Sequence, residues 1–292
     1  MRYLDFFKKF KKPLNNIDSI CKKYGIKNYT INNDGSIDVD GDVDLSDIGL
    51  SKLPLKFRSV SGDFECKYNQ LTSLEGAPES VDGDFSCRNN QLTTLKGAPI
   101  SVGGTFYCYN NQLTTLEGAP ESVGRSFYCH INQLTTLDGA PESVGGDFYC
   151  SNNKLTTLEG APEFVGRDFH CYDNKLTSLK GAPESVGGHF KCNYNKLTSL
   201  QGSPESVGGD FYCQNNKLRS LEGAPEFVGG DFYCHNNPVE YIWNLFKDYS
   251  KVKILNDYDV IRDDKVVLDR LNDFLIHIGK QPVKKVHGYI NI

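Results

Sequence analysis

Residues 145–165 read GGDFYCSNNKLTTLEGAPEFV, and close copies of this block return every 21 residues from about Val60 to Asn237. The cysteines make the period visible, because nine of them lie 21 residues apart: Cys66, Cys87, Cys108, Cys129, Cys150, Cys171, Cys192, Cys213 and Cys234. One such unit is too small to bury its own apolar side chains, so it has to stack on further copies of itself. The chain is therefore predicted to form a solenoid.

The repeat can be written V-G-x-x-F-x-C-x-x-N-x-L-T-x-L-x-G-A-P-x-x. In one copy its defining positions are Phe85, Cys87, Asn90, Leu92, Leu95 and Pro99. Residues two apart on a strand point to the same face, so Phe and Cys are expected inside, in parallel strands about 4.8 Å apart. The two leucines are expected to close the core, and Gly and Pro to bend the chain on the convex side.

The asparagine column, which runs from Asn69 to Asn237, is interpreted as a buried ladder. Its side-chain amides would satisfy backbone groups that the corner of each coil leaves open. A binding role is the alternative, but a polar group that recurs at every corner is more typical of a structural role.

The pattern F-x-C-x-x-N-x-L resembles the leucine-rich repeat family, whose L-x-L-x-x-N-x-L it matches with an aromatic and a thiol side chain in the first two places. The following L-T-x-L-x-G-A-P-E-x-V is similar to the short repeats of bacterial effector proteins, and the whole repeat is similar to predicted proteins of tailed phages and environmental bacteria. The resemblance implies a curved solenoid of the α/β class, mostly β, with a parallel concave sheet. The extra residue in V-G-G-D-F is a departure, so the turn into each strand is expected to differ.

Three segments are predicted. Residues 1–42 form an N-terminal cap, with a helix over about 14–24 and a hairpin around 33–35. Residues 43–237 form the solenoid, whose first copy, 43–60, carries aliphatic side chains at the core positions. Residues 238–292 form a helical C-terminal cap, with a helix after Pro238, a second helix over 264–278 and a short strand over 286–290. Residues 1–12 are basic and amphipathic, and either cover the core end or lie on a membrane or partner.

The charge is uneven along the chain. The net charge is −5, and residues 61–237 hold twelve basic and twenty-one acidic residues. An acidic array argues against nucleic acid as a partner, because phosphate binding needs a basic surface. No apolar run is long enough to span a membrane, and residues 1–12 do not resemble a signal peptide, so a cytoplasmic location is expected.

The cysteines are predicted to be buried, reduced thiols. There is no C-x-x-C pair, and the histidines are spaced irregularly, so neither a metal site nor a cofactor is expected. Side chains stacked at strand spacing are also further apart than the Cβ distance of about 3.8 Å that a disulfide prefers. No phosphate-binding loop, H-E-x-x-H or G-x-S-x-G motif occurs, so the chain is not expected to be an enzyme.

The outward positions beside Phe and Cys are the candidate binding site. Eleven residues there are predicted to contact a partner: Tyr107, Tyr109, Tyr128, His130, Tyr149, His170, Tyr172, Lys191, Tyr212, Tyr233 and His235. Tyrosine offers a large contact area and a polar tip, and the position after Cys changes from copy to copy whereas the convex E-G-A-P-E-S hardly varies. We predict a protein-interaction scaffold, and the similarity to phage proteins implies a phage origin and a host target. Two alternatives are an adhesin that binds glycan through the tyrosines, and tyrosines that only support the strands.

Overall fold

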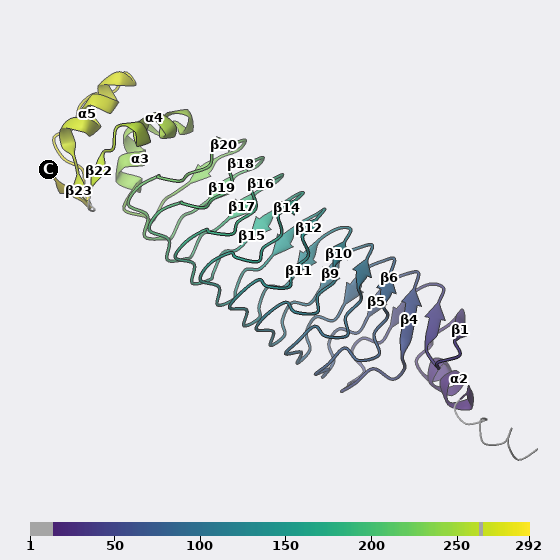
Figure 1. The fold of residues 1–292 in the computed structure, drawn as a ribbon. Coiled ribbons are helices and arrows are strands. Elements are labelled where there is room, and N and C mark those ends of the chain that lie inside the picture. The colour runs from purple at the N-terminus through teal and green to yellow at the C-terminus, as the bar shows by residue number, and fades with distance from the viewer. Residues whose placement is uncertain (1–13, 263–264) are drawn as a thin grey trace, which may run out of the picture. The chain divides into compact units, whose positions relative to one another are not determined.

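The computed structural model describes residues 14–262 and 265–292, and the chain divides into two compact units. Unit 1 comprises Met1–Gln133 with Gly139–Pro141, and unit 2 comprises Leu134–Asp138 with Glu142–Ile292. Each unit is a solenoid of stacked 21-residue coils, here named rungs, and is mostly β (Figure 1). The amphipathic segment predicted over residues 1–12 lies outside the described residues.

One parallel ladder in each unit is built from the Phe of the repeat and the residue after it, and we name it the F–Y ladder. Consecutive rungs pair in register, as Phe106 does with Phe127 and Phe190 with Phe211. This ladder is the parallel sheet that the F-x-C spacing predicts. In unit 1 its strands are β3 (Val43–Asp44), β5 (Phe64–Glu65), β7 (Phe85–Ser86), β9 (Phe106–Tyr107) and β11 (Phe127–Tyr128). In unit 2 they are β13 (Phe148–Tyr149), β15 (Phe169–His170), β17 (Phe190–Lys191), β19 (Phe211–Tyr212) and β21 (Phe232–Tyr233).

A second parallel ladder, the S–V ladder, runs through the Ser-Val pair that precedes the V-G-G turn. The sequence pattern did not predict it, because a two-residue strand shows no alternation. Its valines point inward; Val144 and Val165, for example, are fully buried. In unit 1 it contains β2 (Ile37–Val39), β4 (Phe57–Val60), β6 (Ser80–Val81), β8 (Ser101–Val102) and β10 (Ser122–Val123). In unit 2 it contains β12 (Ser143–Val144), β14 (Phe164–Val165), β16 (Ser185–Val186), β18 (Ser206–Val207) and β20 (Phe227–Val228).

The core of each unit is a set of columns, one for each apolar position of the repeat. Phe85 and Phe106 stack with ring centroids 5.3 Å apart, and Phe190 and Phe211 with centroids 5.4 Å apart. The repeat cysteines are also buried; Cys108, for example, is fully covered, and burial raises the pKa of its thiol well above the usual value. The predicted inward direction of Phe, Cys and both leucines is confirmed. Burying each Phe contributes roughly 2 to 3 kcal/mol.

The asparagine ladder is also confirmed as structural. The Asn111 side-chain amide donates to the carbonyl oxygens of Cys108 (3.0 Å) and Cys87 (3.2 Å), and its Oδ1 accepts from the backbone N–H of Leu92 (3.0 Å). Every ladder asparagine thus joins its own rung to the one before it. The residue just before it has a left-handed backbone, which suits Asn110 (φ 55°) but strains the β-branched Ile131 (φ 53°).

The turn between the two ladders is closed by an aspartate ladder that the sequence pattern did not predict. Oδ1 of Asp63 accepts from the backbone N–H of Asp84 (2.7 Å), and Oδ1 of Asp84 accepts from that of Thr105 (2.7 Å). A Cβ atom on Gly104 would lie 2.1 Å from Oδ1 of Asp84. Gly104 therefore leaves room for this carboxylate.

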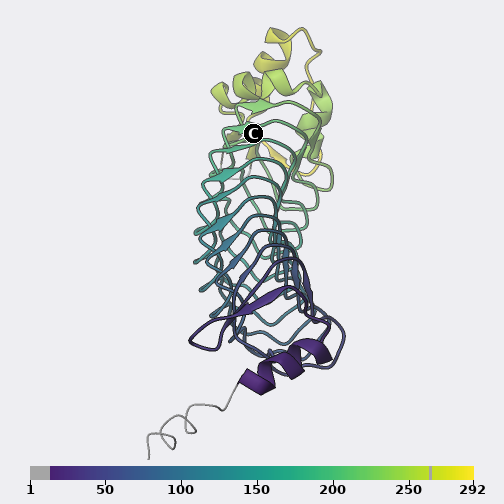
Figure 2. The ribbon, with the colours of Figure 1, turned by 90° about the vertical axis from the view of Figure 1, so that its right-hand side faces the viewer.

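The N-terminal end of unit 1 follows the prediction closely. Helix α2 (Leu14–Lys23) ends before Gly25 (φ 69°) and buries Ile17 and Cys21 across the first coils (Figure 2). Strands β1 (Tyr29–Ile31) and β2 form the predicted antiparallel hairpin, and β2 also pairs with β4. In the aliphatic first rung, β3 pairs in register with β5.

The C-terminal end of unit 2 closes over the last rung. Its elements are α3 (Glu240–Phe246), the short 3₁₀-helix η1 (Tyr249–Lys251), α4 (Val252–Asp257), β22 (Ile261–Arg262), β23 (Lys265–Val266), α5 (Leu268–His277) and β24 (Ile290–Asn291). Phe232 of the last rung packs on Trp243 (5.3 Å between centroids) and Tyr249 (4.9 Å). The helix predicted from residue 264 begins only at Leu268, because β23 pairs with β24. The final strand lies at Ile290–Asn291, later than predicted.

Candidate functional site

The solvent side of the F–Y ladder carries the candidate residues, and we name it the F–Y face. It consists of the side chains between Phe and Cys and those just after Cys. In unit 1, the rings of Tyr107 and Tyr128 stack in parallel, with centroids 5.2 Å apart and an interplanar angle of 3°. Tyr109 and His130 form a second stack beside them, at 4.3 Å and 15°. The structure brings these four predicted residues of unit 1 together as two adjoining columns of rings.

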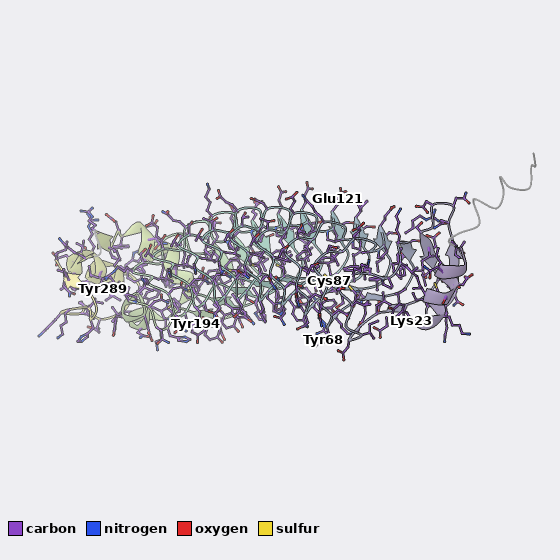
Figure 3. The ribbon with its side chains drawn as sticks, turned by 90° about the horizontal axis from the view of Figure 1, so that it is seen from below. Lys23, Tyr68, Cys87, Glu121, Tyr194 and Tyr289 are labelled. Carbon is purple, nitrogen blue, oxygen red and sulfur yellow. The ribbon has the colours of Figure 1, made fainter. Side chains whose placement is uncertain are left out.

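Arg88 extends the second column of unit 1 by one rung. Its guanidinium lies 5.1 Å from the ring centroid of Tyr68 and 5.3 Å from that of Tyr109, and it hydrogen-bonds to the Tyr109 hydroxyl. Tyr68, which lies in the left-handed position before the ladder asparagine, is 48% exposed. Figure 3 shows Tyr68 and Glu121 at opposite edges of this unit, with Cys87 between them. Arg88 and Tyr68 were not among the eleven predicted contact residues, although the 21-residue period places Arg88 in the same column as Tyr109 and His130.

In unit 2, Tyr212 and Tyr233 form a comparable stack, with centroids 4.7 Å apart and an angle of 10°. Their hydroxyls donate to Asp210 (2.8 Å) and Asp231 (3.0 Å), which raises the pKa of Tyr212 to about 12 and also raises that of Tyr233. Lys191 lies over the Tyr212 ring, 5.2 Å from its centroid. Both phenols therefore stay protonated and are held in place at neutral pH.

The predicted residue His170 is buried rather than presented. It is 5% exposed and lies under Tyr149, with ring centroids 4.0 Å apart, and beside Tyr172, at 5.9 Å. Burial and the nearby Lys191 lower the pKa of His170 to about 4, against the opposing effect of Asp168 and Asp147. His170 thus supports the rings around it, whereas His235, also predicted, is exposed.

Acidification is expected to destabilise unit 2 through His170. The folded chain binds this proton only near pH 4, whereas an unfolded histidine binds it near pH 6.5, so stability is lost as the pH falls between these values. At pH 4.5 the loss amounts to roughly 2 to 3 kcal/mol of unfolding free energy relative to pH 7. Urea unfolding at both pH values should show it, and His170→Tyr, which places there the residue that the preceding rung has at Tyr149, should reduce the loss by that amount. An equal loss of unfolding free energy on acidification in the wild-type protein and the His170→Tyr variant would contradict this role.

The residues before Phe lie at the edge of the F–Y face, and most of the aspartates among them are engaged with the backbone. Oδ1 of Asp210 accepts from the N–H of Asp231 (2.8 Å), and Oδ1 of Asp168 accepts from the N–H of His189 (2.8 Å). In the next rung Nδ1 of His189 replaces the carboxylate and accepts from the N–H of Asp210 (2.8 Å). This column therefore stabilises the turn, and its second carboxylate oxygens orient tyrosines on the face.

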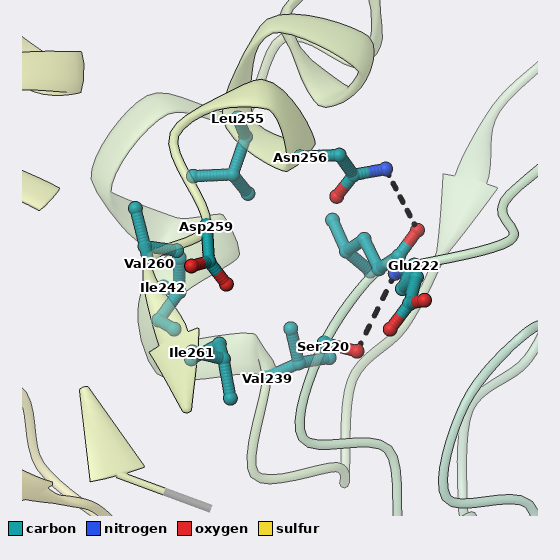
Figure 4. A pocket seen from close by; sticks show the side chains of 10 residues that line it. Ser220, Glu222, Val239, Ile242, Leu255, Asn256, Asp259, Val260 and Ile261 are labelled. Carbon is teal, nitrogen blue, oxygen red and sulfur yellow. Dashed lines mark hydrogen bonds between the residues drawn. The ribbon is translucent and has the colours of Figure 1, made fainter. Parts of the chain in front are cut away.

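A cavity of about 260 Å³ lies between the last rung and the C-terminal helices of unit 2 (Figure 4). Leu255, Val260 and Ile261 form much of its wall, and Asp259 is held by Arg262 and Arg270 at 2.8 and 2.6 Å. Its volume lies below the usual range for ligand pockets, about 300 to 1,000 Å³. Two of its polar lining residues are also paired within the chain already, since the Asn256 side-chain amide donates to the carbonyl oxygen of Leu221 (3.4 Å) and Asp259 is held by the two arginines. This cavity is therefore a weaker candidate than the F–Y face.

Neither a metal-binding cluster nor a membrane-spanning helix occurs among the described residues. Within 14–262 and 265–292, no three His, Cys, Asp or Glu side chains are placed to hold a metal ion together. In the same part of the chain, no helix combines the length and apolar character that crossing a membrane requires.

Among known proteins, similarity to this chain is found in solved structures only. No protein-family model matches the chain, and no curated protein matches it. Among solved structures it is similar to YopM, described as a leucine-rich effector protein from Yersinia pestis, with 23% identity, a TM-score of 0.45 and coverage of 67% of this chain. It is also similar to YopM from Yersinia enterocolitica WA-314, with 18% identity, a TM-score of 0.43 and the same coverage. The chain covers 56% of the length of each of these two YopM structures.

Proposed function

We propose that this protein is a non-catalytic interaction scaffold that binds a protein partner on its F–Y face. The observation that carries the proposal is the set of preformed ring columns in each unit, with polar groups at their edges. Tyr, Arg and His side chains that are already held in place lose little entropy on binding, which favours a protein interface. The chain needs to supply only a rigid surface, as repeat proteins commonly do.

Variation along the face supports a partner of particular shape. Tyr107, Tyr128, Tyr149, Tyr212 and Tyr233 occupy one column, where stacked rings support neighbouring strands. The residue after Cys differs between consecutive rungs of the adjoining column, from Arg88 through Tyr109 to His130 in unit 1. Support of strands alone requires no such variation, so the second column favours recognition.

The ring geometry favours protein over glycan. Sugars bind aromatic residues by stacking on an exposed ring face, where the π-electron density lies. In the pairs Tyr107–Tyr128 and Tyr212–Tyr233 one face of each ring is covered by the other ring. The Tyr212 and Tyr233 hydroxyls are also held by Asp210 and Asp231, and a surface of ring edges and carboxylates suits the mixed surface of a protein.

The buried thiols support the proposed location. Cys87 and Cys192 are fully covered, each donates through Sγ to a carbonyl oxygen of the next rung, and burial raises the pKa of both. Such thiols act as small apolar groups and suit a reducing compartment. We therefore place the protein in the cytoplasm, with a phage origin and a host target as part of the same proposal.

The test is capture of a partner from a host lysate by the immobilised full chain. Tyr107→Ala with Tyr128→Ala, and separately Tyr212→Ala with Tyr233→Ala, should each reduce the captured amount at least about tenfold, since buried interface tyrosines commonly carry 2 kcal/mol or more. Glu117→Ala with Glu121→Ala is the matched control and should change nothing. Circular dichroism checks that each variant is folded. A partner lost on the glutamate change alone, or a glycan bound on an array through the same tyrosines, would overturn the proposal.

A further inference from the structure

A column of lysines lies on one corner of unit 2, away from the F–Y rings. Each lysine directly follows a ladder asparagine: Lys154, Lys175, Lys196 and Lys217. The backbone N–H of Lys175 donates to the carbonyl oxygen of Leu155 (2.9 Å), and that of Lys217 to Leu197 (2.8 Å). These bonds fix each lysine over the preceding rung, so the exposed side chains leave the backbone in a line at intervals of about 4.8 Å.

The coil does not require this charge. In unit 1 the corresponding residues are glutamines: Gln70, Gln91, Gln112 and Gln133. They make the same backbone bond, as Gln91 does to Leu71 (2.9 Å). Like charges on neighbouring rungs repel each other, so the lysine column opposes the folding of unit 2 where glutamine would not. A feature that the fold does not need, and that works against its stability, indicates binding.

Three of the four lysines in the column are not neutralised by neighbours. Within the described residues, Lys175, Lys196 and Lys217 form no ion pair, whereas lysines five positions later in the repeat do: Lys96 pairs with Glu117 (3.1 Å) and Lys180 with Glu159 (2.7 Å). At the C-terminal end of the column, Lys217 and Arg219 line an open groove of about 540 Å³ with Thr198, Asn216 and Pro238. The lysines therefore lead into a recess that can seat one end of a bound chain.

We propose that this column binds an acidic segment of a protein partner. The inference rests on the proposed function and names the chemistry of a second contact. Single-stranded nucleic acid would need an aromatic platform for its bases, but the adjoining left-handed column of unit 2 contains a single aromatic residue, Tyr194, beside Asn152, Asp173, Asn215 and Asn236. The acidic balance of the repeat region also repels a long polyanion, whereas a short acidic segment can stay close to the lysine column.

Fluorescence anisotropy on the full chain tests this, with a fluorescein-labelled peptide of eight glutamates flanked by Gly-Ser as the probe. The combined change Lys154→Gln, Lys175→Gln, Lys196→Gln and Lys217→Gln should weaken binding at least about tenfold, because each exposed charge pair contributes a modest, additive share. Lys96→Gln with Lys180→Gln is the matched control and should leave the affinity unchanged. Wild-type binding should weaken between 50 and 200 mM NaCl, and the fourfold variant should melt at an equal or higher temperature.

A gain-of-function variant makes the test symmetrical. Adding Gln70→Lys, Gln91→Lys and Gln112→Lys to the fourfold variant rebuilds a column on the same corner of unit 1 and should restore peptide binding. Unchanged affinity in the fourfold variant would overturn the inference, as would tighter, lysine-dependent binding of a labelled twelve-nucleotide oligothymidine. Tyr212→Ala with Tyr233→Ala should not alter peptide binding, so failure of this column and failure of the F–Y face can be told apart.

Discussion

Asn111→Ala is expected to lower the unfolding free energy by about 3 kcal/mol, the cost of an orphaned buried donor together with a small cavity in the core. Asn111 is 9% exposed, and its Oδ1 accepts the N–H of Leu92 at 3.0 Å. The carbonyl of Cys87 keeps a second donor from Asn90 (3.0 Å), so the Leu92 N–H is the group left without a partner. Urea unfolding followed by circular dichroism measures the loss.

The adjacent residue is a matched control, because it has the same side chain in a different role. Asn110 is exposed, has a left-handed backbone (φ 55°) and bonds to the neighbouring Asn89 (2.5 Å). Asn110→Gly should cost well under 1 kcal/mol, because glycine adopts this conformation readily. Equal losses of unfolding free energy for the two variants would show that the buried hydrogen bonds of Asn111 stabilise the fold no more than the exposed side chain of Asn110 does.

Removal of residues 239–292 is expected to have the larger effect, with loss of a soluble monomer. It would uncover Phe232 and Leu218, which Trp243, Tyr249 and Val239 now cover. The outer rung of a repeat array lacks a neighbour on one side, so it needs a cap to stay folded and soluble. Size-exclusion chromatography with light scattering should show aggregates, and an equally stable monomer would contradict the capping role.

A point change within the cap separates capping from simple truncation. Phe274 of α5 is fully buried and packs edge-on against Phe246, with centroids 5.4 Å apart, whereas Ile276 on the same helix is 58% exposed. Phe274→Ala should cost about 3 to 5 kcal/mol, and Ile276→Ala well under 1 kcal/mol. Thermal unfolding of both variants distinguishes a packed cap from a loosely attached tail.

The repeat pattern was enough to predict the F–Y ladder, the buried columns and the asparagine ladder. These features follow from local spacing, because Phe85 and Cys87 are two residues apart and Asn90 recurs at every corner. The hairpin around Gly35 and the helix that ends before Gly25 were predictable for the same reason, since both depend on adjacent residues.

Features that depend on contacts between rungs could not be predicted in this way. Most strands of the S–V ladder are two residues long, which is too short for an alternation of apolar and polar residues to distinguish them from turns. The aspartate ladder lies at solvent-accessible positions such as the exposed Asp63 and the half-buried Asp84, where polar residues need no explanation until the next rung is placed beside them. The sequence pattern predicts helix at Lys265–Val266, where the structure has a strand. The pairing partner of this strand, Ile290–Asn291, lies far along the chain, so local spacing gives no indication of it.

The candidate site was predictable as a set of outward columns but not in its geometry. Periodicity places Tyr149 and His170 at the same position in consecutive rungs, and only the packing shows that His170 lies beneath its neighbours. The contribution of Arg88 likewise depends on two rings that approach it from different rungs.

Covalent capture from defined positions on the chain tests most directly whether a protein partner binds on the F–Y face. Benzoylphenylalanine is placed at Tyr107 or Tyr212 on the F–Y face, and at Glu121 or Glu205 as exposed controls off that face. After irradiation in host lysate, mass spectrometry identifies the attached proteins. If the F–Y face binds the partner, we expect one protein to be attached from Tyr107, Tyr212 or both, and from neither glutamate. Capture of the same partner from the glutamates alone would contradict the assignment of the F–Y face.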